Sequence, residues 1–269
     1  MILSMEVAMV EDKALSMIME KHLEAIDINL ENMIESSFGH GSIHAFRESI
    51  RRFRALMFFF IHNIRLSDYR MIEFVSKKFF NMTSLIREID VFESEYGSFM
   101  SKETLDKLSK IKEPLLERLV EELDETNGFR FQHVKIHIRP FKTQSKADKY
   151  QLLRQSELFN SFLEKDDERF KEEKYIHAKR MLAKKLLYVH GILMPDKSDL
   201  SDINEALERF QQMAKLLHDV CVNLRFVGHY KLDDEALITK LVLDHKAFSD
   251  EAEVQYERVC LAMRAFMDK

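Results

Sequence analysis

The sequence contains few of the residues that interrupt helices. Its 269 residues include only six glycines and three prolines, while 46% are hydrophobic and 32% are charged. Glycine and proline supply the special backbone conformations that tight turns need. Their scarcity argues against a fold of many short strands and favours helices with short connections. We therefore predict an all-α protein, long enough for one large domain or two smaller ones.

Cysteines, long apolar runs and excess positive charge are also missing. Cys221 and Cys260 are the only cysteines, which excludes a disulfide framework; both are expected in the core. No run approaches the roughly 18 apolar residues of a membrane span, and the N-terminus lacks a basic and apolar leader pattern. A cytoplasmic protein without a membrane partner is predicted. Because the net charge is −5, any site for an anion must be local.

The sequence also lacks the common signatures of catalysis. It contains no phosphate-binding loop of the Walker type, no nucleophile elbow and no Glu-x-x-His pairs of a di-metal helical bundle. His133 and His137 are four residues apart, but they stand in an alternating segment that ends at Pro140, which disfavours a helical metal site. We expect no catalytic residue, no metal and no cofactor. A metal-dependent or phosphate-processing bundle enzyme acting on a phosphorylated small molecule is the alternative.

Helical periodicity divides the chain into two similar halves. Hydrophobic residues recur at helical spacing over residues 5–35, 42–65, 68–97 and 101–126, and again over 150–190, 200–229 and 232–267. The interruptions carry "SSFGHGS", in which Ser42 is the expected N-cap, then "LSDYR", Asn127-Gly128 and "GILMPDKSD". Residues 129–149 have no clean helical period and are rich in basic residues. We predict a first repeat over residues 1–128, a basic junction over 129–149 and a second repeat over 150–269.

A row of cations follows the start of the second predicted helix. His44, Arg47, Arg51 and Arg54, here called the first basic row, fall within an arc of about 80° at 100° per residue. The row flanks the apolar face formed by Phe46, Ile50 and Phe53, whereas Arg52 points elsewhere. Four adjacent cations repel one another unless acids or a bound anion neutralise them. A negatively charged partner is therefore expected beside this helix.

The same spacing recurs in the second half. His177, Arg180 and Lys184, here called the second basic row, repeat the H-x2-R-x3-[RK] pattern 133 residues later. An Asp-Val pair recurs in "REIDVF" and "LHDVCV", 129 residues apart, which supports an internal repeat. Leu187 stands where the first row has Arg54, so the second row should bind an anion more weakly. Asp90 and Asp219 are the acids that could instead neutralise the rows within the protein.

These two helices resemble the conserved histidine α-helical domain, or CHAD, family. The resemblance rests on "IHAFRESIRRFR" and "IHAKRMLAKKLLY", followed by "REIDV" and "LHDV", and it spans almost the whole chain. It implies two four-helix-bundle repeats related by a pseudo-twofold axis, with a basic central groove. It further implies binding of inorganic polyphosphate without catalysis, in association with polyphosphate granules. Polyphosphate is favoured over nucleic acid, which presents similar repeated phosphates.

The resemblance also selects the residues that contact the ligand. They are the members of the two basic rows: His44, Arg47, Arg51, Arg54, His177, Arg180 and Lys184. Arg87, Lys77 and Lys215 are weaker candidates. Glu88 stands where the family motif often has Asp, which weakens the case for Arg87, and Arg87 could pair with Glu88 or Asp90.

Overall fold

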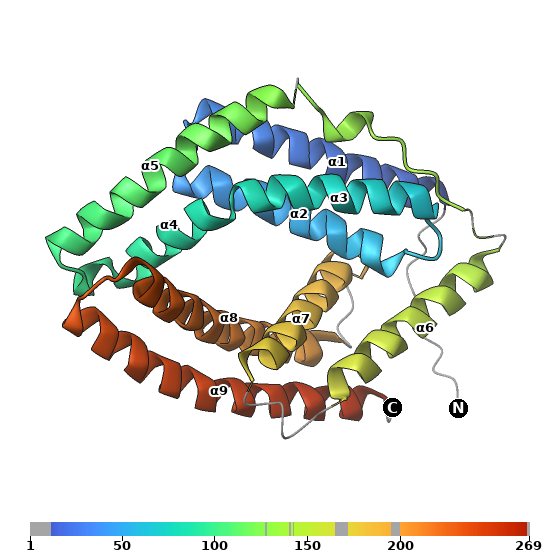
Figure 1. The fold of residues 1–269 in the computed structure, drawn as a ribbon. Helices are drawn as coiled ribbons and strands as arrows, with labels where there is room; N and C mark the ends of the chain where they lie inside the picture. Colours follow the sequence, from blue (N-terminus) through green and yellow to red (C-terminus); the bar gives the residue numbers. More distant parts are fainter. Residues whose placement is uncertain are drawn as a thin grey trace. The chain divides into compact units, whose positions relative to one another are not determined.

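The chain is all-α and divides into two compact units (Figure 1). The computed structural model describes residues 12–126, 128–139, 141, 143–164, 172–194 and 200–267. The first unit comprises Asp12–Pro140 and Leu232–Leu237, and the second comprises Phe141–Lys231 and Ile238–Lys269. Parts of the predicted pattern lie outside the described residues. They are the helical residues 5–11, the turn residue Asn127, Pro140 and residues 195–199.

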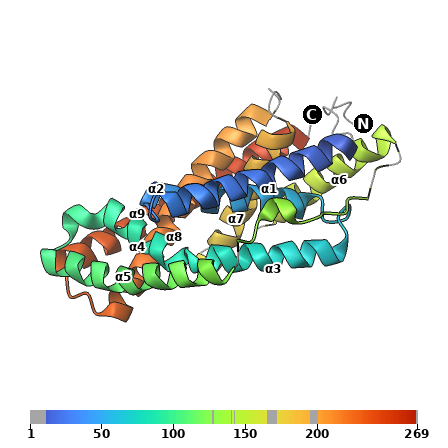
Figure 2. The ribbon, with the colours of Figure 1, turned by 90° about the horizontal axis from the view of Figure 1, so that it is seen from above.

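Five of the described helices form the first unit. They are α1 (Asp12–Glu35), α2 (His40–Phe59), α3 (Leu66–Met82), α4 (Ser84–Tyr96) and α5 (Lys102–Glu125). α1 and α2 run side by side, as both ribbon views show (Figures 1 and 2). The apolar face predicted for α2 is buried, since Phe46, Ile50 and Phe53 are each 0% exposed. "MFFF" also enters the core, except that Phe58 remains partly exposed.

Helix α2 begins and ends earlier than the sequence predicted. Gly39 is the N-cap residue. The Ser42 hydroxyl lies inside the first turn and donates to the Gly39 carbonyl, so the predicted Ser42 cap is wrong. The helix ends at Phe59, and "LSDYR" opens α3 instead of separating helices. Asp68 sits in the first turn of α3, where a carboxylate is favoured by the helix dipole.

The single helix predicted over residues 68–97 is two helices, α3 and α4, separated at Thr83. The Thr83 hydroxyl donates to the Phe80 carbonyl at 3.1 Å, and the Ser84 hydroxyl donates to the same carbonyl at 3.0 Å. Hydroxyl side chains compete in this way with backbone hydrogen bonds and can bend or interrupt a helix. Hydrophobic periodicity continues through the break, which explains why periodicity alone missed it.

A buried carboxylate holds the segment that follows α5. Asp27 on α1 accepts hydrogen bonds from the backbone N–H groups of Phe131 and Gln132, both at 2.8 Å. A short 3₁₀ turn, Phe131–His133, is followed by extended chain that forms an isolated bridge between Ile64 and Ile138. No strand occurs in the described ranges.

Four of the described helices form the second unit: α6 (Gln144–Leu163), α7 (Glu173–Leu193), α8 (Ser201–Tyr230) and α9 (Glu235–Met267). α6 begins six residues before the predicted Tyr150, and the interruption between α6 and α7 was not predicted. The buried Lys179 ammonium donates to the carbonyls of Ser161 and Phe162, at 2.8 and 2.9 Å, which satisfies the C-terminal end of α6. Such a tertiary cap cannot be read from periodicity.

Aromatic rings form the centre of the second unit. The Phe162 ring lies 5.2 Å from Tyr256 and 5.6 Å from Phe210, and the Tyr256 hydroxyl donates to the Phe162 carbonyl. Cys221 and Cys260 are buried, as predicted, and burial raises the pKa of the Cys221 thiol to about 11. Both cysteines are therefore core residues.

The short segment Leu232–Leu237 belongs to the first unit although α8 before it and most of α9 after it belong to the second. Asp234 accepts hydrogen bonds from the Ser101 N–H at 2.7 Å and from the Thr104 hydroxyl at 3.0 Å. This carboxylate lies at the N-terminus of α5, where it is favoured by the helix dipole. None of the described helices is apolar enough over sufficient length to cross a membrane.

Candidate anion-binding site

The first basic row lies on α2, but its members occupy different environments. His44 is exposed, Arg51 and Arg54 are partly exposed, and Arg47 is only 6% exposed. The row therefore does not present four equivalent cations to solvent. Arg47 is buried among other parts of the protein, whereas His44, Arg51 and Arg54 reach the surface.

Arg47 fastens the break between α3 and α4. Its Nη1 donates to the Phe80 carbonyl at 2.6 Å, to the Thr83 hydroxyl at 2.9 Å and to the Ser84 hydroxyl at 3.2 Å. The guanidinium also stacks 3.6 Å from the centre of the Phe80 ring. Burial, with the charge of Arg51 as a second cause, lowers the pKa of Arg47 to about 9, which leaves it charged at neutral pH.

Arg51 and Arg54 carry carboxylate partners. Arg51 Nη1 lies 3.3 Å from Glu48, one turn earlier on α2, and its guanidinium lies 5.0 Å from the Phe80 ring. Arg54 donates to both carboxylate oxygens of Glu73 on α3, from Nε at 3.1 Å and from Nη2. The side chains of Arg51 and Arg54 remain 23% and 32% exposed, so both are within reach of a ligand.

The acids proposed from sequence to neutralise the rows have other partners. Asp90 is buried and pairs with Lys112 on α5. Asp219 lies 2.7 Å from Lys215 on its own helix, α8. In the first row, Arg51 pairs with Glu48 and Arg54 pairs with Glu73. Glu48 could have been found from its position three residues before Arg51, but Glu73 lies on another helix.

The second basic row lies on α7, where all three members are half-buried. The His177 ring lies 4.3 Å from the ring of His218 on α8, and Lys184 Nζ lies 5.3 Å from the Tyr188 ring. Burial, the proximity of His218 and the positive charge of Arg180 lower the pKa of His177 to about 4. His177 is therefore neutral at pH 7, and it contributes hydrogen-bonding capacity instead of charge.

A family model matches residues 17–228 of this chain, and its description is CHAD domain. The chain belongs to the CHAD family. The solved structure of PptA from Streptomyces chartreusis is similar to this CHAD chain with a TM-score of 0.58 at 12% identity, covering 93% of this chain and 98% of that one. This similarity supports the all-α fold alone. No curated protein matches the chain.

Glu173, His218 and Arg225 form a cluster beside His177 of the second basic row in this CHAD chain. Glu173 lies at the start of α7 and accepts hydrogen bonds from Arg225 on α8 at 2.6 and 3.1 Å. His218 Nδ1 lies 3.2 Å from the same carboxylate, and burial lowers the pKa of His218. Sequence reasoning assigned none of these residues a role. His218 immediately precedes Asp219 of the repeated Asp-Val pair, which was the available signal.

The pKa of His177 predicts how stability depends on pH. Between about pH 6.5 and 4, His177 is protonated in the unfolded chain but neutral in the folded protein. The free energy of unfolding should therefore fall as pH falls through this window. After allowance for partial exposure, we expect a loss of about 1 kcal/mol. Urea unfolding of the wild type and of His177→Gln at pH 7 and pH 5 measures this loss of stability. The variant should lose less stability than the wild type, and identical losses would contradict the assignment.

The weaker candidates are scattered. Arg87 Nη1 contacts His40 Nε2. Lys77 is exposed on α3, and Lys215 pairs with Asp219. Of the three, Lys77 is the most accessible to a ligand.

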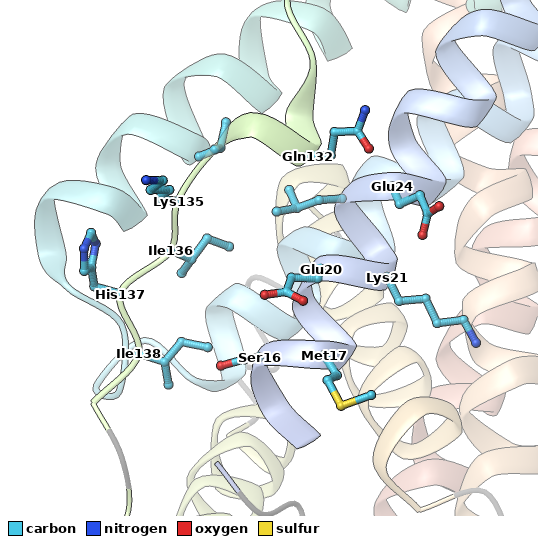
Figure 3. Close-up of a pocket in the computed structure, with 12 residues that line it drawn as sticks. Ser16, Met17, Glu20, Lys21, Glu24, Gln132, Lys135, Ile136, His137 and Ile138 are labelled. Carbon is cyan, nitrogen blue, oxygen red and sulfur yellow. The ribbon is translucent and has the colours of Figure 1, made fainter. Parts of the chain in front are cut away.

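A cavity of about 770 Å³ lies away from the members of the first row, between α1 and the extended segment after α5 (Figure 3). Glu20 and Glu24 line it together with Lys21 and Lys135, so its charges balance. The Ile136 side chain is directed toward α1, whereas His137 lies on the other side of the segment (Figure 3). A cavity with balanced charge gives no preference for a polyanion. Within the described ranges, no group of three or more histidine, cysteine or acidic residues is suited to hold a metal ion.

Proposed function

We propose that this CHAD protein binds inorganic polyphosphate, without catalysis, through the two basic rows. The observation that carries the proposal is the recurrence of one His/Arg/basic spacing on α2 and α7 in a chain of net charge −5. Guanidinium groups match phosphate oxygens through paired N–H donors, and ammonium groups act as compact charges. A polyanion is the class of ligand that would gain from several such cations at once.

We infer that the two rows serve one site because the helices occur in the same order in each half. α1, α2, the broken pair α3–α4 and α5 correspond to α6, α7, α8 and α9. Leu66–Tyr96 and Ser201–Tyr230 differ in length by one residue. On this proposal, residues 1–128 and 150–269 are repeats related by a pseudo-twofold axis, joined by residues 129–149. The axis would bring both rows to a central groove.

The contacts within each unit refine the set of residues proposed to bind. His44, Arg51 and Arg54 on α2 and His177, Arg180 and Lys184 on α7 are the proposed contacts. Arg47 is a positioning residue, because its donors already hold the α3–α4 break. Arg54 directs Nε and Nη2 at Glu73, so a phosphate would approach Nη1 or compete with that carboxylate.

A titration with polyphosphate of defined length at several salt concentrations tests the proposal. Binding a polyanion releases counterions, so affinity should fall steeply with salt, with a log–log slope of about −3 to −4 if four to six cations contact single-chain phosphates. Isothermal titration calorimetry measures the affinity at each salt concentration, and these values give the slope. An affinity that stays constant as salt increases would contradict the mechanism.

Two further arms of the same experiment separate alternative functions. Single-stranded RNA as competitor should displace polyphosphate poorly, because RNA carries fewer phosphates per unit length than polyphosphate. A phosphate-release assay should detect no turnover, whereas release of phosphate would favour the enzyme alternative. On this proposal the protein needs no cofactor and associates with cytoplasmic polyphosphate granules.

A further inference from the structure

The exposed face of α3 combines apolar and basic side chains. Leu66 and Phe74 are 54% and 72% exposed, and Arg70 and Lys77 are exposed between and beside them. These four residues fall within an arc of about 80° at 100° per residue. The acids of α3 do not balance this face, because Asp68 is buried and Glu73 is paired with Arg54. We call these four residues the α3 face.

A second exposed stripe runs along α9 and has the opposite charge. Val254 and Leu261 are 46% and 64% exposed, and Asp250 and Glu257 are exposed between and beside them. These residues fall within an arc of about 60°; Lys246 and Arg264 lie along one edge of it. We call these four residues the α9 stripe. Large exposed apolar side chains aligned on one helix face indicate a contact surface more strongly than isolated ones do.

We propose that the α9 stripe of a second copy of this chain packs antiparallel on the α3 face. The two sets match in order along the helices. Their pairs are Leu66 with Leu261, Arg70 with Glu257, Phe74 with Val254, and Lys77 with Asp250. Each set extends over about 16 Å of helix. Every apolar residue thus meets an apolar residue, and every cation meets a carboxylate.

A cavity lies at the C-terminal end of α3, next to the α3 face. It has a volume of about 310 Å³, lies between the α3–α4 break and α5, and includes Leu85, Leu115 and Leu119 among its lining residues. Leu243, two helical turns before Asp250, is 62% exposed. In the antiparallel register Leu243 lies just beyond Met82, the last residue of α3 and one of the residues that line this cavity, so we expect its side chain to approach the cavity. An apolar anchor in a pocket, flanked by charged pairs, is the usual arrangement of a helix that docks in a groove.

The proposed contact joins two different faces. It closes into a dimer if the two copies exchange both contacts and otherwise extends into longer assemblies. Both outcomes use the same pairs, so charge-reversal variants test the contact without assuming its symmetry. The test uses the whole chain without polyphosphate, which keeps it independent of the proposed function.

Sedimentation velocity from about 1 to 100 µM measures the association, since contacts of this size bind in that range. Lys77→Glu and Asp250→Lys should each weaken association about tenfold, and the double variant should restore it. Arg70→Glu and Glu257→Lys should behave in the same way. Lys110→Glu, an exposed reversal on α5, is the matched control and should have no effect.

An apolar pair of variants completes the test. Phe74→Glu should abolish association, whereas Leu153→Glu, which replaces a 55% exposed leucine on α6, should not. A wild type that stays monomeric at every concentration would overturn the proposal. Charge reversals whose effects add, without rescue in the double variant, would also overturn it. Rescue that does not depend on protein concentration would overturn it too, because the contact would then lie within one chain.

Discussion

Reversing Arg51 and Arg54 together should reduce polyphosphate affinity by about two orders of magnitude at low salt while leaving the helices intact. The two residues are the partly exposed guanidinium groups of the first row. Replacing them by Glu removes two contacts and adds two repelling charges beside the bound anion. Calorimetry measures the affinity, and far-UV circular dichroism measures the helix content.

The controls for this prediction separate location from charge. Arg52→Glu with Lys110→Glu changes the net charge equally, but both residues are exposed outside the row, so affinity should change by less than about threefold. Arg51→Gln with Arg54→Gln avoids placing a second carboxylate against Glu73 and should still weaken binding about tenfold. Glu73→Gln should act in the opposite direction, because it releases Arg54. Full affinity in the double reversal would remove the first row from the site.

Replacing Arg47 by Met should instead lower stability, by about 2 to 4 kcal/mol. The change removes three hydrogen bonds and leaves the Phe80 carbonyl and two hydroxyls with fewer partners at the α3–α4 break. It also removes the stacking of the guanidinium on Phe80. Urea unfolding monitored by circular dichroism measures the loss.

Arg52→Met is the matched control, because it removes a guanidinium from the same helix at a 55% exposed position. Its free energy of unfolding should change by less than about 0.5 kcal/mol. At temperatures where the Arg47→Met variant remains folded, its affinity for polyphosphate should be closer to that of the wild type than the affinity of the Arg51 and Arg54 double reversal is. Unchanged stability with complete loss of binding would show that Arg47 contacts the ligand.

The boundaries of several helices could be predicted because local signals mark them. α5, α8 and α9 lie within about three residues of the predicted ranges. Ser101 caps α5 by accepting from the Thr104 N–H, a signal that belongs to the sequence itself. The breaks at Thr83 and after Leu163 were missed because Arg47 and Lys179 stabilise them from other helices.

The sequence by itself determined the all-α class, the CHAD resemblance and the angular position of each basic row, because periodicity and spacing are properties of one helix. Only the tertiary structure decided which members of a row remain accessible. Arg47 is buried because the α3–α4 break lies against α2, Arg54 is paired because α3 places Glu73 beside it, and His177 is neutral because it is half-buried beside His218 on α8. Burial and pairing depend on neighbouring helices, and helical spacing within one segment carries no information about them.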